Sequence, residues 1–578
     1  MGKSKKPSAI GTLISRLGES RGLLREKLYE LVNPVEKYPH VTIREPRYFV
    51  SLPKIKKLSS VDLTYPLMEP FAYAEIKWDG NKRGITYNLR EPELSKKDLE
   101  TLAKLEENLS QVIDLKMSAI ENKEKAAEYL EKKVKQIIAE TGMKIDPERF
   151  VNIMYYIVRN FAGINEIEPL MHDPYIEDIG CSGINTPIYI IHRKFGSIET
   201  SIVYRNIDQL SDFVVKLAER CGRYISYAEP LLDGSLPDGS RVQASLAKDV
   251  TTKGPTFSIR KFRENPLSPV DMINLNTASP KLMAYMWFLM QHNVSVLLCG
   301  GVSTGKTTML NVLSMFIPPE DKIISIEDTR EINLPHENWI PSVTRAGFGV
   351  PESGGKKYGE IDLFDLLKES FRQNPDYVVV GEIRGKEAYV MFQGMNSGHP
   401  SLGTIHAGSI SDVIKRLETP PIELSPSLIE ALDVLIVMVN AREKGKSSRR
   451  VKSVVEVQSV DAHTGNPHSI ETFGWVPSTD EFKENISSSD VLRRISFEKG
   501  IPYPKILREL EKRERILEWM QKNEVTRFDE VSKLINLYYK EEDTIMEWVT
   551  KGLPPYKTKS KKEVESIWKS STGLGTMK

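Results

Sequence analysis

The stretch GGVSTGKTTMLNVLSMF, residues 300–316, places three glycines, a lysine and three threonines between two apolar segments. The segment before it, Val294–Cys299, is short and apolar, which predicts a buried strand. The apolar residues that follow recur at helical spacing, which predicts a helix. The loop between them matches the pattern G-x-x-x-x-G-K-[ST] in the strand–loop–helix context that the pattern requires. The stretch therefore predicts a phosphate-binding loop in an α/β domain.

Each residue type in this loop suits phosphate binding. Glycines let backbone N–H groups approach phosphate oxygens, and the N-terminus of the following helix adds a partial positive charge. Lys306 is expected to reach the β- and γ-phosphates, and Thr307 to offer its hydroxyl to Mg²⁺. We therefore predict ATP and Mg²⁺ as cofactors. The predicted nucleotide-binding residues are Gly300, Gly301, Ser303, Thr304, Gly305, Lys306, Thr307 and Thr308.

Length, charge and cysteine content limit the class of protein. The 578 residues are enough for several domains, and the 80 Lys and Arg balance 79 Asp and Glu, so no basic excess points to a nucleic-acid partner. Cys181, Cys221 and Cys299 lie far apart and form neither a disulfide framework nor a zinc pattern, which fits a reducing compartment. No apolar run reaches the roughly 18 residues of a membrane span, and no secretory signal is visible. We expect a cytoplasmic protein unless a partner holds it at a membrane.

Changes in composition along the chain predict four regions. Residues 1–110 start with a basic amphipathic helix between Ile10 and Leu31, followed by a small mixed domain. The helix either docks on a membrane or partner, or packs on its own domain. Residues 111–265 begin helical and continue with short strands, which indicates an α+β domain. From 280 to about 460 strands alternate with helices, which predicts a parallel α/β sheet in a domain spanning 266–480, and 481–578 form a charged helical tail.

Acidic residues and a histidine occur at the ends of predicted strands. Glu327 directly follows one strand, Glu382 follows a second, and His406 ends a third. In open parallel sheets, functional groups gather at the carboxyl ends of strands. Asp376 begins the second strand, about 20 Å from Glu382, and so belongs to the opposite edge. The predicted strands are Lys322–Ile326, Tyr377–Val380 and Thr404–His406.

These side chains complete a predicted ATP-hydrolysing site. Glu327 is the candidate for activating water, and Glu382 is the candidate for binding Mg²⁺ together with Thr307. His399 and His406 have no further clear metal ligand near them in the sequence. We therefore interpret His406 as a phosphate or interface sensor rather than a metal ligand, with a histidine of the core as the alternative.

Several segments resemble motifs of the secretion ATPase superfamily, which contains the motors of type II and type IV secretion and of type IV pili. Ile326–Glu331 resembles its Asp box, and Gly398–His406 resembles its His box. Val380–Arg384 resembles its Walker B motif, with glycine where many P-loop enzymes have aspartate. Ser325–Trp339 and Gly254–Phe262 are similar to the archaeal branch, which includes the archaellum motor ATPase.

The resemblance, over about residues 165–460, carries expectations beyond the residues themselves. It implies a RecA-like ATPase domain preceded by a smaller α+β domain, and a hexameric ring in which the two domains move with nucleotide state. It implies Glu327 as catalytic base and Glu382 as Walker B acid, with Arg241 and Arg260 reaching the phosphates. The predicted catalytic residues are Lys306, Glu327, Glu382, His406, Arg241 and Arg260, with Arg330 and Arg384 as secondary candidates.

The leading hypothesis is a homo-hexameric ATPase motor. It would act on a polytopic membrane platform protein at the inner face of the cell membrane, to assemble or rotate an archaellum or type IV pilus-like filament or to drive type II-like secretion. A nucleic-acid-translocating conjugation ATPase is the alternative, which the balanced charge disfavours. A non-hydrolysing nucleotide switch is disfavoured because it need not retain both Glu327 and Glu382.

Overall fold

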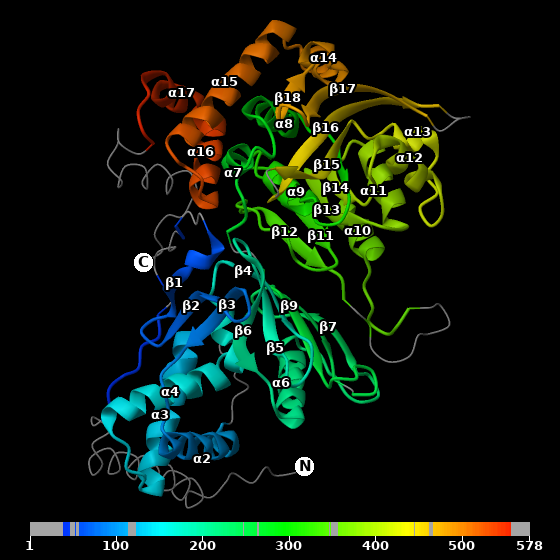
Figure 1. Cartoon of the computed structure of the whole chain (residues 1–578). Coiled ribbons are helices and arrows are strands. Elements are labelled where there is room, and N and C mark those ends of the chain that lie inside the picture. The colour runs from blue at the N-terminus through cyan, green and yellow to red at the C-terminus, as the bar shows by residue number, and fades with distance from the viewer. Residues whose placement is uncertain are drawn as a thin grey trace, which may run out of the picture. The chain divides into compact units, whose positions relative to one another are not determined.

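The computed structural model describes residues 38–555 except 45, 47–51, 54–56, 114–122, 247, 263–264, 346, 348–355, 444–445 and 462–465. The chain forms two compact units, Met1–Lys261 and Phe262–Lys578. Figure 1 shows the elements of both units. The basic helix predicted between Ile10 and Leu31 lies outside the described residues, and the division into four domains stays a prediction.

The first unit is built on a mixed sheet. Over the described residues its nine strands lie in the order β1-β2-β3-β6-β5-β4-β9-β8-β7. Strands β3 and β6 run parallel, and the other neighbours are antiparallel. The strands are β1 Asp62–Met68, β2 Ala72–Asp79, β3 Gly84–Arg90, β4 Ile176–Cys181, β5 Pro187–His192, β6 Gly196–Val203, β7 Leu231–Ser235, β8 Arg241–Ser245 and β9 Thr256–Arg260.

Helices supply the rest of the first unit's core. In α4, the buried residues Phe150, Ile153, Met154 and Ile157 recur every three or four positions, which gives the helix one apolar face. These residues join side chains from the sheet in one hydrophobic cluster. The unit is therefore α+β, as the sequence predicted. Its helices are α2 Lys96–Val112, α3 Lys123–Thr141, α4 Pro147–Phe161, α5 Glu168–Met171 and α6 Ile207–Arg220.

The second unit is built on a largely parallel sheet. Its described strands lie in the order β12-β11-β13-β14-β10-β15-β16-β17-β18. The six strands from β12 to β15 are parallel, and β16 to β18 extend the sheet antiparallel. The strands are β10 Val296–Gly300, β11 Ile323–Glu327, β12 Trp339–Val343, β13 Tyr377–Ile383, β14 Ser401–Ile405, β15 Val434–Glu443, β16 Lys446–Val460, β17 Pro467–Val476 and β18 Glu481–Glu484.

Helices cover both faces of this sheet. In β10, Val296 and Leu298 pack with α7–α9 and α14–α17, whereas Leu297 and Cys299 pack with α10–α13. A strand that is buried on both faces has apolar residues at consecutive positions, which explains the uninterrupted apolar segment before the loop. The helices are α7 Pro269–Asn274, α8 Pro280–Gln291, α9 Lys306–Ser314, α10 Leu363–Arg372, α11 Glu387–Asn396, α12 Ile410–Glu418, α13 Pro426–Ile429, α14 Asp490–Lys499, α15 Tyr503–Lys522, α16 Phe528–Lys540 and α17 Glu542–Lys551.

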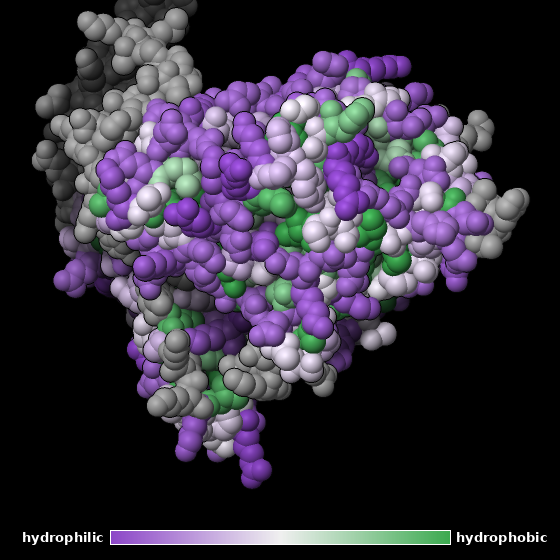
Figure 2. Space-filling view, turned by 90° about the horizontal axis from the view of Figure 1, so that it is seen from above, coloured by the Kyte–Doolittle hydropathy of each residue, from purple (hydrophilic) through white to green (hydrophobic). Residues whose placement is uncertain are grey.

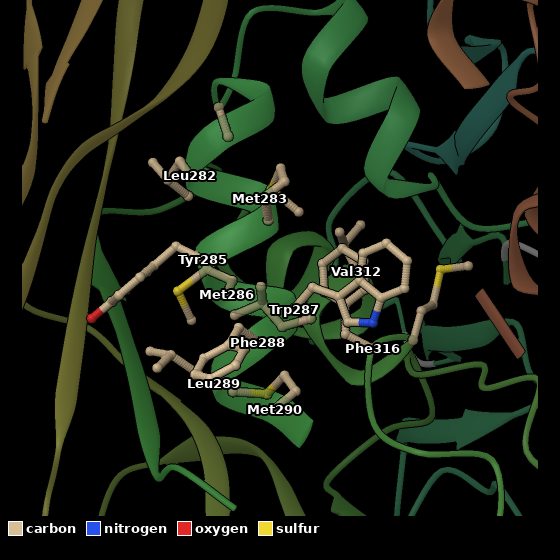
Figure 3. Packing of buried hydrophobic residues seen from close by; sticks show 14 of the residues in the cluster. Leu282, Met283, Tyr285, Met286, Trp287, Phe288, Leu289, Met290, Val312 and Phe316 are labelled. Atoms are coloured by element: carbon tan, nitrogen blue, oxygen red, sulfur yellow. The ribbon is translucent and has the colours of Figure 1, made fainter. Parts of the chain in front are cut away.

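The C-terminal helices share the core of the parallel sheet. Helix α8 is buried all round, and its Trp287 ring stacks on Phe316 with ring centroids 5.4 Å apart (Figure 3). Tyr538 of α16 meets the same indole edge-on at 5.0 Å. The predicted helical tail is therefore helical as far as it is described, and it packs against the sheet's helices.

Across the described part of the chain, no helix is both long and apolar enough to cross a membrane. The face seen in Figure 2 is mainly hydrophilic, with hydrophobic residues in small separate areas. Isolated apolar side chains of this kind are ordinary on protein surfaces.

Candidate functional site

The phosphate loop joins β10 to α9, as the sequence predicted. β10 ends at Gly300 and α9 begins at Lys306. A Cβ atom at Gly300 would lie 2.5 Å from the Met438 carbonyl oxygen, so no larger residue fits there. Gly305 has φ +91°, the left-handed conformation that favours glycine. The two glycines of the pattern are thus required by packing and by backbone conformation.

Lys306 is buried and folded back onto its own loop. Its Nζ atom donates to the carbonyl oxygens of Gly300 and Gly301, at 3.1 and 2.8 Å. The same atom lies 3.3 Å from Nδ1 of His406. Burial lowers the pKa of the lysine below its usual value. The ammonium therefore sits at the loop, where a phosphate group would compete with the two carbonyls for it.

The predicted acids and His406 reach the same edge of the sheet as the phosphate loop. Strands β11, β13, β14 and β10 are neighbours and run parallel, so their carboxyl ends lie side by side. Glu327, which the sequence placed just after its strand, is the last residue of β11, and His406, which the sequence placed at the end of its strand, follows the end of β14. The sequence placed Glu382 after its strand, which is wrong. β13 continues to Ile383 past a register irregularity, so Glu382 lies inside the strand.

His406 connects the phosphate loop to Glu382. Its Nε2 atom lies 3.1 Å from Oε1 of Glu382, while Nδ1 faces the Lys306 ammonium. An ammonium only donates hydrogen bonds, so Nδ1 accepts and the ring proton resides on Nε2, which donates to the carboxylate. Burial and the positive charge of Lys306 lower the pKa of His406, in keeping with a neutral ring.

Glu382 is held as a carboxylate. Partial burial alone would raise its pKa, but the hydrogen bond from Arg384 and the charges of Arg384 and Lys306 lower it. Arg384 also lies 3.3 Å from Oδ2 of Asp328, beside β11. Arg384, a secondary candidate for the phosphates, therefore binds two acids of the site in this structure.

Glu327 is the most deeply buried acid of the site, with 3% of its surface exposed. Its Oε1 atom accepts hydrogen bonds from the backbone N–H groups of Glu331 and Ile332, at 2.9 and 3.0 Å. Its Oε2 atom is buried and has no hydrogen-bond partner among the described residues. Burial raises the pKa of Glu327 to about 7. A carboxyl group with one fixed and one unpaired oxygen, and a pKa near neutrality, suits a general base.

Arg330, the other secondary candidate, is enclosed by aromatic rings. Its guanidinium carbon lies 5.3 Å from the ring centroids of both Phe262 and Trp339. The Trp339 indole in turn donates to Oγ of Ser325 at 2.9 Å. Arg330 thus makes cation–π contacts that hold the segment following Glu327 in place.

Arg241 and Arg260 lie side by side in the first unit. They are direct partners in the register of β8 and β9. Arg241 pairs with Asp233 at 3.0 Å, and Arg260 pairs with Asp178 at 3.1 Å. Like charges directly opposite one another repel, and each aspartate offsets that repulsion for its arginine. Their predicted contact with nucleotide phosphates stays a prediction.

Mg²⁺ suits the donor groups at this edge. Among the residues that the structure describes, no three His, Cys, Asp or Glu side chains gather as a ready-made metal site. Mg²⁺ is commonly held by one or two carboxylates, several waters and substrate phosphates, so it needs no such cluster. Glu382, kept ionised, and the hydroxyl of Thr307 at the start of α9 are oxygen donors of the right kind.

Comparison with known proteins identifies the family. The family model described as "Type II/IV secretion system protein" matches residues 164–472, more than half of the chain. An uncharacterized protein of Methanocaldococcus jannaschii is 33% identical over 550 residues, covering 90% of this chain and 95% of that protein. The chain belongs to the type II/IV secretion system protein family. The predicted superfamily is thereby confirmed, with its fold class, and the chain is a secretion ATPase.

Other relatives cover smaller parts of the chain. The type IV secretion system protein PtlH of Bordetella pertussis is 30% identical, covering 43% of this chain and 81% of PtlH. A probable conjugal transfer protein, TrbB of Sinorhizobium fredii, is 28% identical, covering 40% of this chain and 68% of TrbB. Among solved structures, the pilus retraction motor PilT with bound ADP is 14% identical, covering 60% of this chain and 90% of PilT, with a TM-score of 0.34.

Three residues at this edge were not predicted from the sequence. A Cβ atom at Gly381 would lie 3.1 Å from Cγ of Glu327, and Asn440 and Arg449 contact the phosphate loop. The sequence showed that Gly381 stands where many Walker B segments have aspartate. It did not show that Gly381 lies next to Glu327. Asn440 and Arg449 carry no local signal because they come from a distant hairpin of this secretion ATPase.

Proposed function

We propose that this secretion ATPase is a hexameric motor that couples ATP hydrolysis to assembly or rotation of a type IV pilus-like filament, either an archaellum or a pilus, or to type II-like secretion. The observation that carries the proposal is the environment of Glu327. A buried carboxyl group with one oxygen fixed by two N–H groups and the other unpaired is arranged to accept a proton. A nucleotide switch has no use for such a group.

Hydrolysis would use the groups around the loop in defined roles. The loop N–H groups and Lys306 hold the phosphates, and Lys306 exchanges its two carbonyl partners for phosphate oxygens. Glu327 takes a proton from water at Oε2 while the water oxygen attacks the γ-phosphorus and ADP leaves. When bound through Thr307 and Glu382, Mg²⁺ supplies charge neutralisation at the phosphates. His406 senses the loop's state through Lys306 and passes it to Glu382.

The first unit would contribute the arginines. Arg241 and Arg260 carry guanidinium groups that spread charge over phosphate oxygens, and both now pair with aspartates. Nucleotide would replace Asp233 and Asp178 as their partner, which couples binding to movement of one unit against the other. We propose that a polytopic membrane platform protein receives that movement at the inner face of the cell membrane.

A nucleic-acid-translocating motor is the second candidate. The similarity to a probable conjugal transfer protein favours it. The balance of 80 basic and 79 acidic residues counts against it, because nucleic-acid motors track a polyanion with a basic groove. Stimulation of ATP turnover by single-stranded DNA, with a steep loss at higher salt, would favour this candidate over the filament motor.

The test of the motor proposal is ATP turnover by wild type and Glu327→Gln, with oligomer mass measured in the same samples. We expect Mg²⁺-dependent turnover that rises as the protein assembles. The variant should bind ATP but hydrolyse it at least about 100-fold more slowly, because the amide cannot accept the proton. Lys483→Ala, which removes an exposed cation from β18, is the control. Binding without turnover in every assembly state of wild type would contradict the proposal.

A further inference from the structure

Two side chains from the β15–β16 hairpin contact the outside of the phosphate loop. β15 runs beside β10 with Met438 opposite Gly300, and it continues beyond the point where β10 ends. Asn440, two residues further along β15, is paired in register with Arg449 of β16. The hairpin therefore places these two residues next to each other and beside the loop.

Each of the two side chains donates to one carbonyl of the loop. Asn440 Nδ2 lies 3.4 Å from the carbonyl oxygen of Val302, and Arg449 Nε lies 3.0 Å from that of Ser303. Ser303 has φ +59°, a left-handed conformation that is uncommon for a residue other than glycine. The bond from a charged donor stabilises this conformation.

The stem of Arg449 also packs against the loop. A Cβ atom at Gly305 would lie 3.1 Å from Cδ of Arg449, so the absence of a side chain at Gly305 leaves the room that the arginine uses. Arg449 is thus fixed to the loop at two points, through Nε at Ser303 and through Cδ at Gly305. This second contact distinguishes it from a surface arginine that touches a carbonyl by chance.

Holding a carbonyl also directs the N–H group of the same peptide unit. In a planar trans peptide, the C=O and the N–H of the next residue point in opposite directions. The hydrogen bonds to Val302 and Ser303 therefore turn the N–H groups of Ser303 and Thr304 away from the hairpin. Loop N–H groups that point away from the carbonyl side are the donors that bind phosphate oxygens.

We propose that Asn440 and Arg449 are positioning residues that preorganise the phosphate loop for the phosphates of a nucleoside di- or triphosphate. They act through the loop backbone and do not touch the reacting atoms. This inference rests on the proposed function in requiring that the loop binds nucleotide. It predicts that the affinities for ADP and for ATP depend equally on the two residues, because the loop has its shape before either nucleotide binds.

The experiment measures the dissociation constants of ADP and of a non-hydrolysable ATP analogue, AMP-PNP, on the full chain. We expect Arg449→Ala to weaken both by about tenfold and Asn440→Ala by about threefold, because a charged donor contributes more than a neutral one at 3.4 Å. Arg449→Lys should resemble Arg449→Ala, because lysine keeps the charge but has no Nε donor at this position. KM for ATP should rise by the same factor as the dissociation constants while kcat changes less than about threefold.

Controls separate positioning from charge and from folding. Lys483→Ala removes an exposed cation from β18, at the far edge of the sheet, and should bind both nucleotides as wild type does. The melting temperature without nucleotide should be unchanged in all the variants, because Asn440 and Arg449 are exposed. If Arg449→Ala lowers the melting temperature, nucleotide binding by Asn440→Ala and Arg449→Lys still tests whether these residues position the loop.

Three outcomes would overturn the inference. Normal binding of both nucleotides by Arg449→Ala and Asn440→Ala would show that the loop is shaped without them. Loss of AMP-PNP affinity alone would mean that Arg449 contacts the terminal phosphate directly. Wild-type affinity in Arg449→Lys would mean that charge alone matters. Failure of the wild type to bind either nucleotide would instead remove the proposed function, and the inference with it.

Discussion

Glu327 and Gly381 directly follow Ile326 and Val380, the last paired residues of the parallel strands β11 and β13, and a Cβ atom at Gly381 would lie 3.1 Å from Cγ of Glu327. The same added atom would lie 3.6 Å from Oε1, the oxygen that two backbone N–H groups hold. The glycine in the Walker B segment thus leaves the space in which the candidate base is placed.

Replacing Gly381 with alanine should therefore displace the Glu327 carboxyl group. We expect turnover to fall by about tenfold or more, because a general base is sensitive to small changes in position, while affinity for ATP changes little. Steady-state kinetics and nucleotide binding would measure the two effects. Gly80→Ala is the matched control, since nothing lies within 4 Å of a Cβ atom there and the backbone is not left-handed. Full activity in Gly381→Ala would contradict the steric role of this glycine.

The pKa of Glu327, raised to about 7 by burial, should make both stability and activity depend on pH. The folded state binds the Glu327 proton more tightly than the unfolded chain does. The contribution of this group to the free energy of unfolding is therefore complete below about pH 4.5, and it is lost as pH rises through about 7. Relative to Glu327→Gln, wild type should lose on the order of 2–3 kcal/mol of unfolding free energy between pH 5 and pH 8. Turnover should instead increase over this range, because the base acts as a carboxylate.

A half-buried acid provides the control for this pH dependence. Burial, with the nearby Asp376 and Glu320, raises the pKa of Asp321 to about 6. Asp321 lies before β11, away from the carboxyl edge that bears the site. Asp321→Asn should alter the pH dependence of stability and leave the pH dependence of turnover unchanged. A turnover profile that moves with Asp321→Asn would refute the assignment to Glu327.

Arg513 should be essential for packing the C-terminal helices. Its buried guanidinium lies 5.2 to 5.4 Å from the ring centroids of Trp287, Phe288 and Tyr538 and pairs with Glu509 at 3.2 Å. Arg513→Ala removes the cation and leaves a partly buried acid, which should cost about 3 kcal/mol.

Denaturant unfolding followed by tryptophan fluorescence would measure this loss, since Trp287 is itself a contact. Arg515→Ala, an exposed arginine on the same helix α15, should shift the transition by less than about 0.5 kcal/mol. Equal effects of the two substitutions would show that the buried contacts of Arg513 contribute nothing specific.

Deleting residues 1–35 should separate hydrolysis from docking. The candidate nucleotide-site residues all lie at 241 or beyond in the sequence, so ATP turnover should change less than about twofold when the predicted basic amphipathic helix is removed. Recovery with the membrane platform protein should fall, because a basic apolar face suits a membrane-associated partner. Unchanged co-purification with that partner would contradict the docking role. Loss of ATP turnover would instead indicate the alternative, in which the helix packs on its own domain.

Local features of the sequence were enough to predict most of the second unit. The phosphate loop and the strands around it depend on neighbours in the chain, because backbone conformation, helix capping and apolar runs act over a few residues. The predicted end of β13 was wrong because its last residues depart from regular pairing with β14, a relationship between strands. For the same reason, the sequence named Glu327 but not Gly381, its steric partner.

The sequence by itself was enough to predict a phosphate-binding loop and two acids at the same edge of the sheet, and it carries the motifs of a secretion ATPase. Only the tertiary structure decided how these groups act on one another. Lys306 and His406 are 100 residues apart, and Arg449 is 146 residues from Ser303, yet both pairs are in contact. The physical reason is that strand order and register set these contacts, and apolar periodicity marks which residues are buried without specifying which strands become neighbours.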